Sequence, residues 1–370
     1  MNPFKYGCVV GGENFCPRPQ LQRHLRELLK SGQNVVVQGP RRMGKTSLVC
    51  ETVGSMRGVK LLYVDLFCVR TIGEFCRRVV VAASKCGKGR SFLDRLAALV
   101  KGLRPVFSVD RDTGAPTITV DVKAAKDESS ADEVMNMIAK MAKGNRLCVV
   151  FDEFQDILDL PDADAIVACL RAKIQFLADT PFVFLGSIRN AMHTIFNSPK
   201  SPFFKSAVNY GVDSINRKDF CEFLVSRFAA GNRRLSRDIA DLIIERAAEV
   251  SGDVQELAET TWLETREGQQ IGIEDVERGM QTVFAREHRS FAAMKSRLTT
   301  VQLSVLYGLA KDENAKVFSS DFLESNGIRN VGSISKALKR LQEDEYIFEF
   351  EGEYRFENPF FRAWLQEAMK

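Results

Sequence analysis

Between residues 34 and 215, short apolar runs alternate with longer segments whose apolar residues recur every three or four positions. The short runs are typical of buried strands, and the longer segments are typical of helices. Strands that alternate with helices form a mostly parallel sheet with helices on both faces. The predicted strands are residues 34–38, 60–67, 146–156, 181–187 and 207–215, and the predicted helices between them are residues 45–56, 71–86, 91–103, 129–144 and 162–178.

Two parts of the chain depart from this alternation. Residues 105–122 hold two β-rich runs around Asp-Thr-Gly-Ala-Pro, which predicts a hairpin inserted into the α/β domain. After residue 216 the pattern is helical, and from residue 298 three helices precede two short β runs with Gly352 between them. That order is typical of a winged helix-turn-helix. We therefore predict an α/β core over residues 1–215, a helical lid over 216–295 and a winged helix over 296–370.

The composition is that of a soluble globular protein. Of the 370 residues, 45% are hydrophobic and 27% are charged, and the net charge of +4 is too mild to indicate a nucleic-acid partner by itself. Nine cysteines without a C-x-x-C spacing, and three widely separated histidines, favour reduced thiols over disulfides or structural zinc. The N-terminus lacks a signal-peptide pattern, and no apolar run approaches the roughly 18 residues of a membrane span. We expect a cytoplasmic protein with no membrane contact.

Residues 39–46, GPRRMGKT, fit the phosphate-loop pattern G-x-x-x-x-G-K-[ST] between a predicted strand and a predicted helix. Its glycines let backbone N–H groups approach phosphate oxygens, Lys45 supplies a positive charge for the β- and γ-phosphates, and Thr46 offers a hydroxyl to Mg²⁺. The N-terminus of the following helix adds its dipole. The residues predicted to bind the nucleotide here are Gly39, Pro40, Arg41, Arg42, Met43, Gly44, Lys45, Thr46 and Ser47.

The paired arginines inside this loop leave two interpretations open. Arg41 and Arg42 could add contacts to a phosphate or to a partner's nucleotide. Alternatively, their side chains point into solvent while the backbone does the binding, which we favour because the loop's N–H groups suffice.

An acid pair follows the third predicted strand. Four apolar residues precede Asp152 and Glu153, so the strand is predicted to be buried and the acids to emerge at its carboxyl end. Asp152 is placed to hold Mg²⁺ through its water shell, and Glu153 to polarise an attacking water. The fourth strand ends with Ser187 and Arg189, which could position water or sense the γ-phosphate; Ser187 could instead cap a helix.

Five segments together resemble the archaeal-type ATPases, P-loop proteins related to AAA+ and STAND NTPases. These segments are residues 14–29, 39–48, 149–157, 182–207 and 357–365. The resemblance spans essentially the whole chain and implies an ATPase core, a helical lid and a C-terminal winged helix. A more distant resemblance to origin-recognition initiators implies that backbone near Phe15 to Arg18 lies against adenine. It also implies ATP or ADP with Mg²⁺, and no guanine-specific N-K-x-D motif occurs.

One position departs from the related pattern. AAA+ proteins commonly carry an arginine that reaches the γ-phosphate on the lid helix after a Gly-Asp turn. Here the run is SGDVQEL, and Gln255 stands where that arginine would be. If this alignment holds, the coupling of the lid to hydrolysis is weaker.

The predicted recognition helix of the winged helix carries polar and basic residues that could face a DNA groove: Ser333, Lys336, Lys339 and Arg340. Residues 298–370, however, contain nine Lys and Arg against twelve Asp and Glu, whereas a dedicated DNA binder is usually basic. Three functions therefore remain open: an ATPase switch, a nucleotide-gated switch with negligible turnover that binds a protein partner, and a DNA-binding regulator.

Overall fold

The computed structural model describes residues 2–109, 114, 116–123, 127–187, 190–350 and 352–369, and the side chains of Ser187, Asn190 and Phe350 lie outside this description. The chain forms two compact units. The first is Gly11–Asp213, and the second combines Met1–Val10 with Ser214–Lys370.

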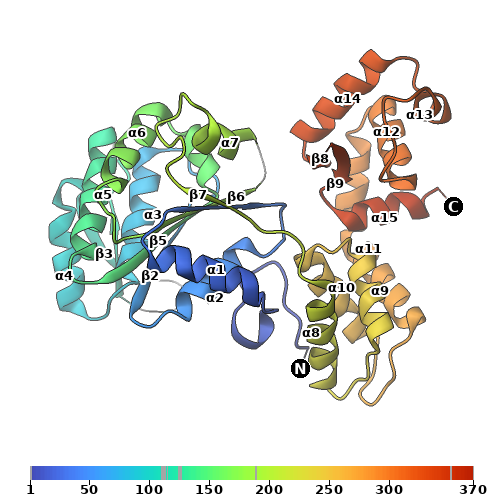
Figure 1. Cartoon of the computed structure of the whole chain (residues 1–370), viewed down its shortest axis with the longest axis horizontal. Helices are drawn as coiled ribbons and strands as arrows, with labels where there is room; N and C mark the ends of the chain where they lie inside the picture. Colours follow the sequence, from blue (N-terminus) through green and yellow to red (C-terminus); the bar gives the residue numbers. More distant parts are fainter. Residues whose placement is uncertain are drawn as a thin grey trace. The chain divides into compact units, whose positions relative to one another are not determined.

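A five-stranded parallel sheet in the order β2-β5-β6-β1-β7 forms the centre of the first unit, as the alternating pattern predicted (Figure 1). Strand β6 lies between β1 and β5, so the strand that leads into the phosphate loop is not adjacent to the strand that ends in the acid pair. The strands are β1 (Val35–Gly39), β2 (Val59–Asp65), β5 (Arg146–Asp152), β6 (Phe182–Ser187) and β7 (Val208–Gly211).

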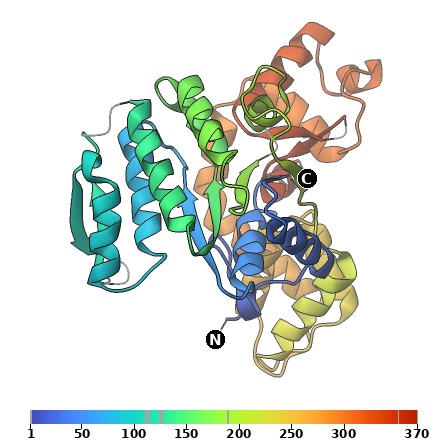
Figure 2. The same ribbon diagram turned by 60° about the vertical axis from the view of Figure 1, so that its left-hand side comes forward.

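Helices cover both faces of this sheet (Figures 1 and 2). Buried residues of α3, α5 and α6 share one large core with every second residue of the central strands, including Val36, Phe151 and Phe184. Helices α1 and α2 pack together on the other face. The helices of this unit are η1 (Gly12–Asn14), α1 (Pro19–Lys30), α2 (Lys45–Gly54), α3 (Ile72–Ser84), α4 (Arg90–Leu99), η2 (Lys101–Leu103), α5 (Glu128–Ala142), η3 (Phe154–Asp159), α6 (Ala163–Ile174) and α7 (Asn190–Asn197).

The predicted hairpin insertion is present. Strands β3 (Pro105–Val109) and β4 (Pro116–Val120) pair antiparallel, and β4 packs against α3 through its buried residues Ile118 and Val120. Residues 110–113 and 115, between the two strands, lie outside the described residues.

The second unit is helical except for one β hairpin. Helices α8 (Arg217–Ala229), α9 (Arg237–Arg246), α10 (Ser251–Leu263) and α11 (Ile273–Ser296) come first. They are followed by the predicted winged-helix order: α12 (Thr300–Lys311), α13 (Ser320–Ser325), α14 (Val331–Glu343), β8 (Ile347–Phe350), β9 (Glu353–Phe356) and α15 (Pro359–Glu367). Ile334, Leu338 and Leu341 on α14 are buried and form its packed face.

The N-terminal residues pack within the second unit, although the sequence-based division keeps them with the core. Phe4 is only 4% exposed, and its ring centroid lies 4.8 Å from that of Phe228 and 6.1 Å from that of Trp262. Arg227 Nη2 donates a hydrogen bond to the Pro3 carbonyl oxygen at 3.0 Å. We call residues 2–6 the N-terminal anchor.

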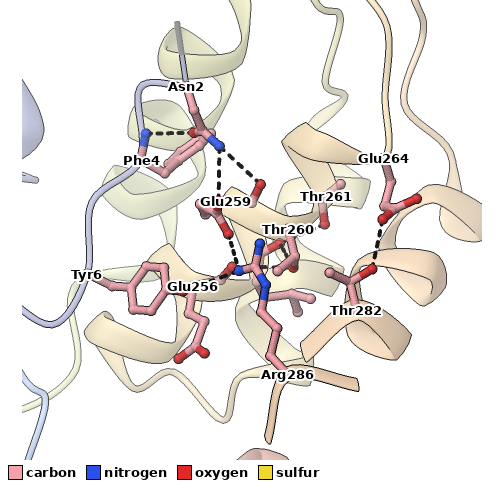
Figure 3. A network of polar contacts seen from close by, with 11 residues as sticks. Asn2, Phe4, Tyr6, Glu256, Glu259, Thr260, Thr261, Glu264, Thr282 and Arg286 are labelled. Atoms are coloured by element: carbon pink, nitrogen blue, oxygen red, sulfur yellow. Dashed lines mark hydrogen bonds and ion pairs between the residues drawn. The ribbon is translucent and has the colours of Figure 1, made fainter. Parts of the chain in front are cut away.

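Polar contacts complete the N-terminal anchor (Figure 3). Asn2 Nδ2 donates to the Glu259 carbonyl oxygen on α10 at 3.3 Å. The Glu259 carboxylate accepts a charged hydrogen bond from Arg286 Nη1 on α11 at 2.6 Å, and the same nitrogen donates to the Tyr6 hydroxyl at 3.2 Å. The chain therefore passes between the two units twice, at residues 10–11 and 213–214.

Within the described part of the chain, no helix is both long and apolar enough to cross a membrane. All nine cysteines are free thiols.

Candidate functional site

The phosphate loop joins the carboxyl end of β1 to the start of α2. A Cβ on Gly39 would lie 2.3 Å from the Val212 carbonyl oxygen, so only glycine fits at the point where the strand enters the loop. Gly44 has φ +78°, a left-handed conformation that suits glycine. Both glycines of the motif are therefore explained by local geometry.

Lys45 lies across this loop and is 9% exposed. Its Nζ donates hydrogen bonds to the Gly39 and Pro40 carbonyl oxygens, at 2.8 and 2.9 Å. The loop carbonyls thus hold the ammonium group at the mouth of the loop, where a phosphate oxygen could replace them as its partner.

Thr46 and the first acid of the pair meet across the sheet edge. Thr46 Oγ1 donates to Asp152 Oδ2 at 2.7 Å, and the Tyr63 hydroxyl on β2 donates to the same oxygen at 2.8 Å. Burial raises the pKa of the Asp152 carboxyl group, while the hydrogen bonds from Thr46 and Tyr63 oppose that rise. Burial also raises the pKa of Tyr63, and the nearby Asp152 raises it further, so the phenol stays a donor.

The second acid begins a tight turn after β5. Glu153 has φ +49°, a left-handed conformation for a non-glycine residue, and its backbone N–H donates to Asp152 Oδ1 at 3.0 Å. Gln155 Nε2 donates to Glu153 Oε2 at 2.5 Å. The two carboxylates of the pair therefore have separate partners: Asp152 faces Thr46 and Tyr63, and Glu153 is held by Gln155.

Strand register brings these groups to one edge of the sheet. Gly39 pairs with Ser187 across β1 and β6, and Asp65 pairs with Asp152 across β2 and β5. The backbone of Ser187 is thus next to the start of the phosphate loop. The Ser187 side chain and all of Arg189 lie outside the described residues, so their sensor role remains a prediction.

Arg18 ties the phosphate loop to the segment after β7. Its Nη2 donates to the Met43 carbonyl oxygen at 2.5 Å, and its Nη1 donates to the Asp213 carbonyl oxygen at 2.8 Å. Burial lowers the pKa of this guanidinium to about 10, which still leaves it charged at neutral pH. Phe15 is buried close by in sequence, and the adenine contact predicted for Phe15 to Arg18 remains a prediction.

The other predicted nucleotide-binding residues divide by exposure. Met43 and Ser47 are buried, whereas Arg41 and Arg42 are exposed. Whether the backbone or these side chains bind the nucleotide remains a prediction. Gln255 is buried on α10 in the second unit, and its role at the γ-phosphate remains a prediction.

The basic residues of the predicted recognition helix α14 are exposed but partly paired with acids on the same helix. Arg340 Nη1 lies 3.3 Å from Glu343 Oε2, and Lys339 Nζ lies 4.0 Å from Glu343 Oε1. Lys336 is also exposed, while the Ser333 hydroxyl donates to Asn330 Oδ1 at 3.1 Å at the start of the helix. These acids reduce the positive potential that a DNA backbone would meet.

Two residues of the site were not identified from the sequence. Tyr63 is one aromatic position in an apolar strand, and its role depends on β2 lying beside β5. Gln155 follows the acid pair, and only the turn geometry directs its amide back to Glu153. In the sequence, the only indication of a role for Gln155 is that a polar residue stands two positions after the acid pair.

Comparisons with known proteins agree with this architecture. Residues 289–367 match a family model described as a probable winged helix domain. A Walker-type ATPase of Pyrococcus abyssi is similar in structure, with a TM-score of 0.69, 17% identity, and coverage of 98% of this chain and 99% of that one. The ORC2 protein of Aeropyrum pernix, solved as ADPNP-ADP complexes, gives a TM-score of 0.53 at 15% identity and covers 95% and 93% of the two chains.

At these identities the likeness shows the fold. It confirms the predicted fold class, a parallel-sheet P-loop core with a C-terminal winged helix, and it matches the family resemblance at the level of fold. No curated protein matches the sequence of this chain.

Proposed function

We propose that this protein binds ATP with Mg²⁺ and hydrolyses it slowly, and that the nucleotide state controls the placement of its winged helix. The observation that carries the proposal is the hydrogen bond from Thr46 to Asp152, beside Lys45 at the mouth of a glycine-bounded loop. In a phosphate-loop ATPase these two oxygen-bearing groups are the ones that hold Mg²⁺. The likeness to a Walker-type ATPase supports the same reading.

The donor set fits Mg²⁺, which prefers oxygen ligands and usually keeps several waters. Thr46 and Asp152 would hold the ion, and a cation here would favour the charged form of the buried Asp152 carboxyl group. When bound, Mg²⁺ would neutralise charge on the phosphates.

The residues of the chain then have distinct roles. Lys45 leaves the loop carbonyls for the β- and γ-phosphate oxygens, and the loop N–H groups hold the phosphates in place. A water oxygen attacks the γ-phosphorus, the bond from that phosphorus to the bridging oxygen breaks, and Glu153 takes the water proton. ADP and phosphate are the products.

The domain division predicted from the sequence fits this mechanism as a proposal. Residues 1–215 would bind the nucleotide, residues 216–295 would form the lid, and residues 296–370 would carry the response. The N-terminal anchor modifies this division, because residues 1–10 pack with the second unit.

Steady-state turnover of the wild type against Glu153→Gln tests the proposal. We expect at least a tenfold loss of turnover with retained ATP binding, because the variant keeps the shape of the side chain but not its basicity. Lys45→Ala should abolish nucleotide binding, while Lys140→Ala, at an exposed lysine of α5, serves as the control. Equal turnover in wild type and Glu153→Gln would contradict hydrolysis, and tight binding by Lys45→Ala would contradict the phosphate-loop assignment.

The second candidate is a nucleotide-gated regulator with little turnover that acts through α14. The exposed Lys336, Lys339 and Arg340 favour a DNA ligand, whereas the acids paired with two of them favour a protein ligand. A salt titration separates these: affinity for DNA that falls steeply with salt supports phosphate contacts. Absence of DNA binding at low salt excludes that ligand.

A further inference from the structure

Gln155 lies between the acid pair and strand β6, in a position that packing alone does not explain. The residue is 8% exposed. Its Nε2 donates to Glu153 Oε2 at 2.5 Å and lies 3.3 Å from Asp156 Oδ1. One amide nitrogen thus contacts carboxylate oxygens of both Glu153 and Asp156.

The turn that carries this glutamine is itself held in place. Asp156 Oδ2 accepts a hydrogen bond from the Cys68 backbone N–H at 2.7 Å, which fixes the turn to the segment after β2. Glu153 has a left-handed backbone, which is strained for a non-glycine residue. The backbone is therefore constrained on both sides of Gln155, and the Glu153 side chain is oriented by the amide.

The oxygen of the same amide is buried as well. Among the described residues, no group bonds to the buried Gln155 Oε1. A Cβ on Gly186 in β6 would lie 2.7 Å from this oxygen, so the strand has a glycine where the amide needs room. A buried polar atom without a partner destabilises the fold, so an apolar side chain of the same shape would pack here at lower free energy. The hydrogen bond from its nitrogen to Glu153 explains why an amide is present at this position.

A second unpartnered amide lies on the same face of the sheet. Gln38 Nε2 is buried and lacks a partner within the described ranges, and Gln38 pairs with Gly186 in the register of β1 and β6. Paired residues of neighbouring strands point to the same face. The Gln38 amide nitrogen, next to the phosphate loop, and the Gln155 amide oxygen, next to the acid pair, are thus both available on that face to form hydrogen bonds in another state of the protein.

We propose that Gln155 is a positioning residue that holds the carboxylate of Glu153 in the orientation needed to take a proton from the attacking water. The inference rests on the proposed hydrolysis. It assigns the orientation of the general base, Glu153, to a residue that belongs neither to the phosphate loop nor to the acid pair. Gln155 acts through Glu153, the residue to which its amide nitrogen donates.

The test is a double-mutant cycle with Gln155→Met, which keeps the length and approximate volume of the side chain and removes the donor. Turnover, KM and nucleotide affinity are measured for wild type, Glu153→Gln, Gln155→Met and the double variant. We expect Gln155→Met to lower kcat about tenfold with nucleotide affinity within twofold. In the Glu153→Gln background the same change should alter kcat less than twofold, because the group through which Gln155 acts is already lost. Gln175→Met, at an exposed glutamine of the same unit, is the control.

The possible outcomes distinguish a positioning role of Gln155, a purely structural role, and failure of the proposed function. If Gln155→Met lowers kcat equally in both backgrounds, or weakens nucleotide binding in parallel, its role is structural and the inference is wrong. If Glu153→Gln abolishes turnover but Gln155→Met does not change it, the inference fails while the proposed function stands. If wild-type turnover equals that of Glu153→Gln, the proposed function itself fails. Should Gln155→Met not fold, Gln155→Asn keeps an amide but is one methylene too short to reach Glu153, and wild-type turnover in this variant would overturn the inference.

Discussion

Removing the Tyr63 hydroxyl tests how much its hydrogen bond to the Asp152 carboxylate contributes to stability and to Mg²⁺ binding. The change Tyr63→Phe keeps the ring in strand β2 and deletes only the donor that lies 2.8 Å from Asp152 Oδ2. Asp152 is 7% exposed, so bulk water has little access to replace that donor. The carboxylate would keep the hydrogen bonds from Thr46 and from the Glu153 N–H, at 2.7 and 3.0 Å.

The magnitude follows from the charge on the acceptor. A hydrogen bond to a charged group contributes about 1.5–3 kcal/mol, which for a unit of this size lowers the melting temperature by roughly 3–10 °C. Loss of a group that orients a metal ligand commonly weakens metal binding about 10- to 100-fold. We therefore expect a lower melting temperature and at least a tenfold rise in the Mg²⁺ concentration needed for half-maximal ATP binding.

Nucleotide binding titrated with Mg²⁺, together with thermal unfolding of the metal-free protein, measures both effects. Tyr210→Phe is the matched control. Tyr210 also belongs to a strand of this sheet, but its hydroxyl donates to a neutral acceptor, the Leu21 carbonyl oxygen, at 2.5 Å. It should lower stability by about 1 kcal/mol and leave the Mg²⁺ dependence unchanged. A Tyr63→Phe protein with wild-type stability and wild-type Mg²⁺ dependence would refute the role assigned to this hydroxyl.

Two further predictions concern the N-terminal anchor and pH. Phe4→Ala should destabilise the second unit by up to about 3–5 kcal/mol, the usual range for a buried phenylalanine. Both tryptophans, Trp262 and Trp364, lie in that unit, so tryptophan fluorescence during denaturant unfolding measures the loss of stability. Phe318→Ala, at a half-exposed phenylalanine, is the control. Unchanged unfolding would show that the anchor does not contribute. Because burial raises the pKa of Asp152 above its usual 3.8, the folded metal-free protein holds this proton more tightly than the unfolded chain. The associated stability is present below pH 3.8 and is lost as pH rises through the raised pKa. Urea unfolding of wild type and Asp152→Asn across this range should show the free energy of unfolding of wild type fall relative to that of the variant as pH rises, and a difference that stays constant with pH would contradict the raised pKa.

The sequence predicted those features that depend on neighbours along the chain. The phosphate loop is one contiguous motif, and the strand before Asp152 is a run of apolar residues, so both could be recognised locally. The contact from Tyr63 to Asp152 depends on which strands are adjacent, and alternation of strands and helices does not specify strand order. Gln155 depends on the conformation of a single turn. Phe4 shows no periodicity at all, because it is one apolar residue in an irregular segment whose partners are more than 200 residues away.

The way in which the second unit is assembled has a consequence for synthesis on the ribosome. Pro3 and its partner Arg227 are separated by 224 residues, and the first unit is a continuous segment between them. Because domains generally fold as units in the order in which they are made, the phosphate-loop unit can complete its fold while Phe4 still lacks its partners. The N-terminal anchor must then stay available until α8, α10 and α11 have emerged. During that interval Phe4 is exposed, and its docking would be one of the last steps in folding.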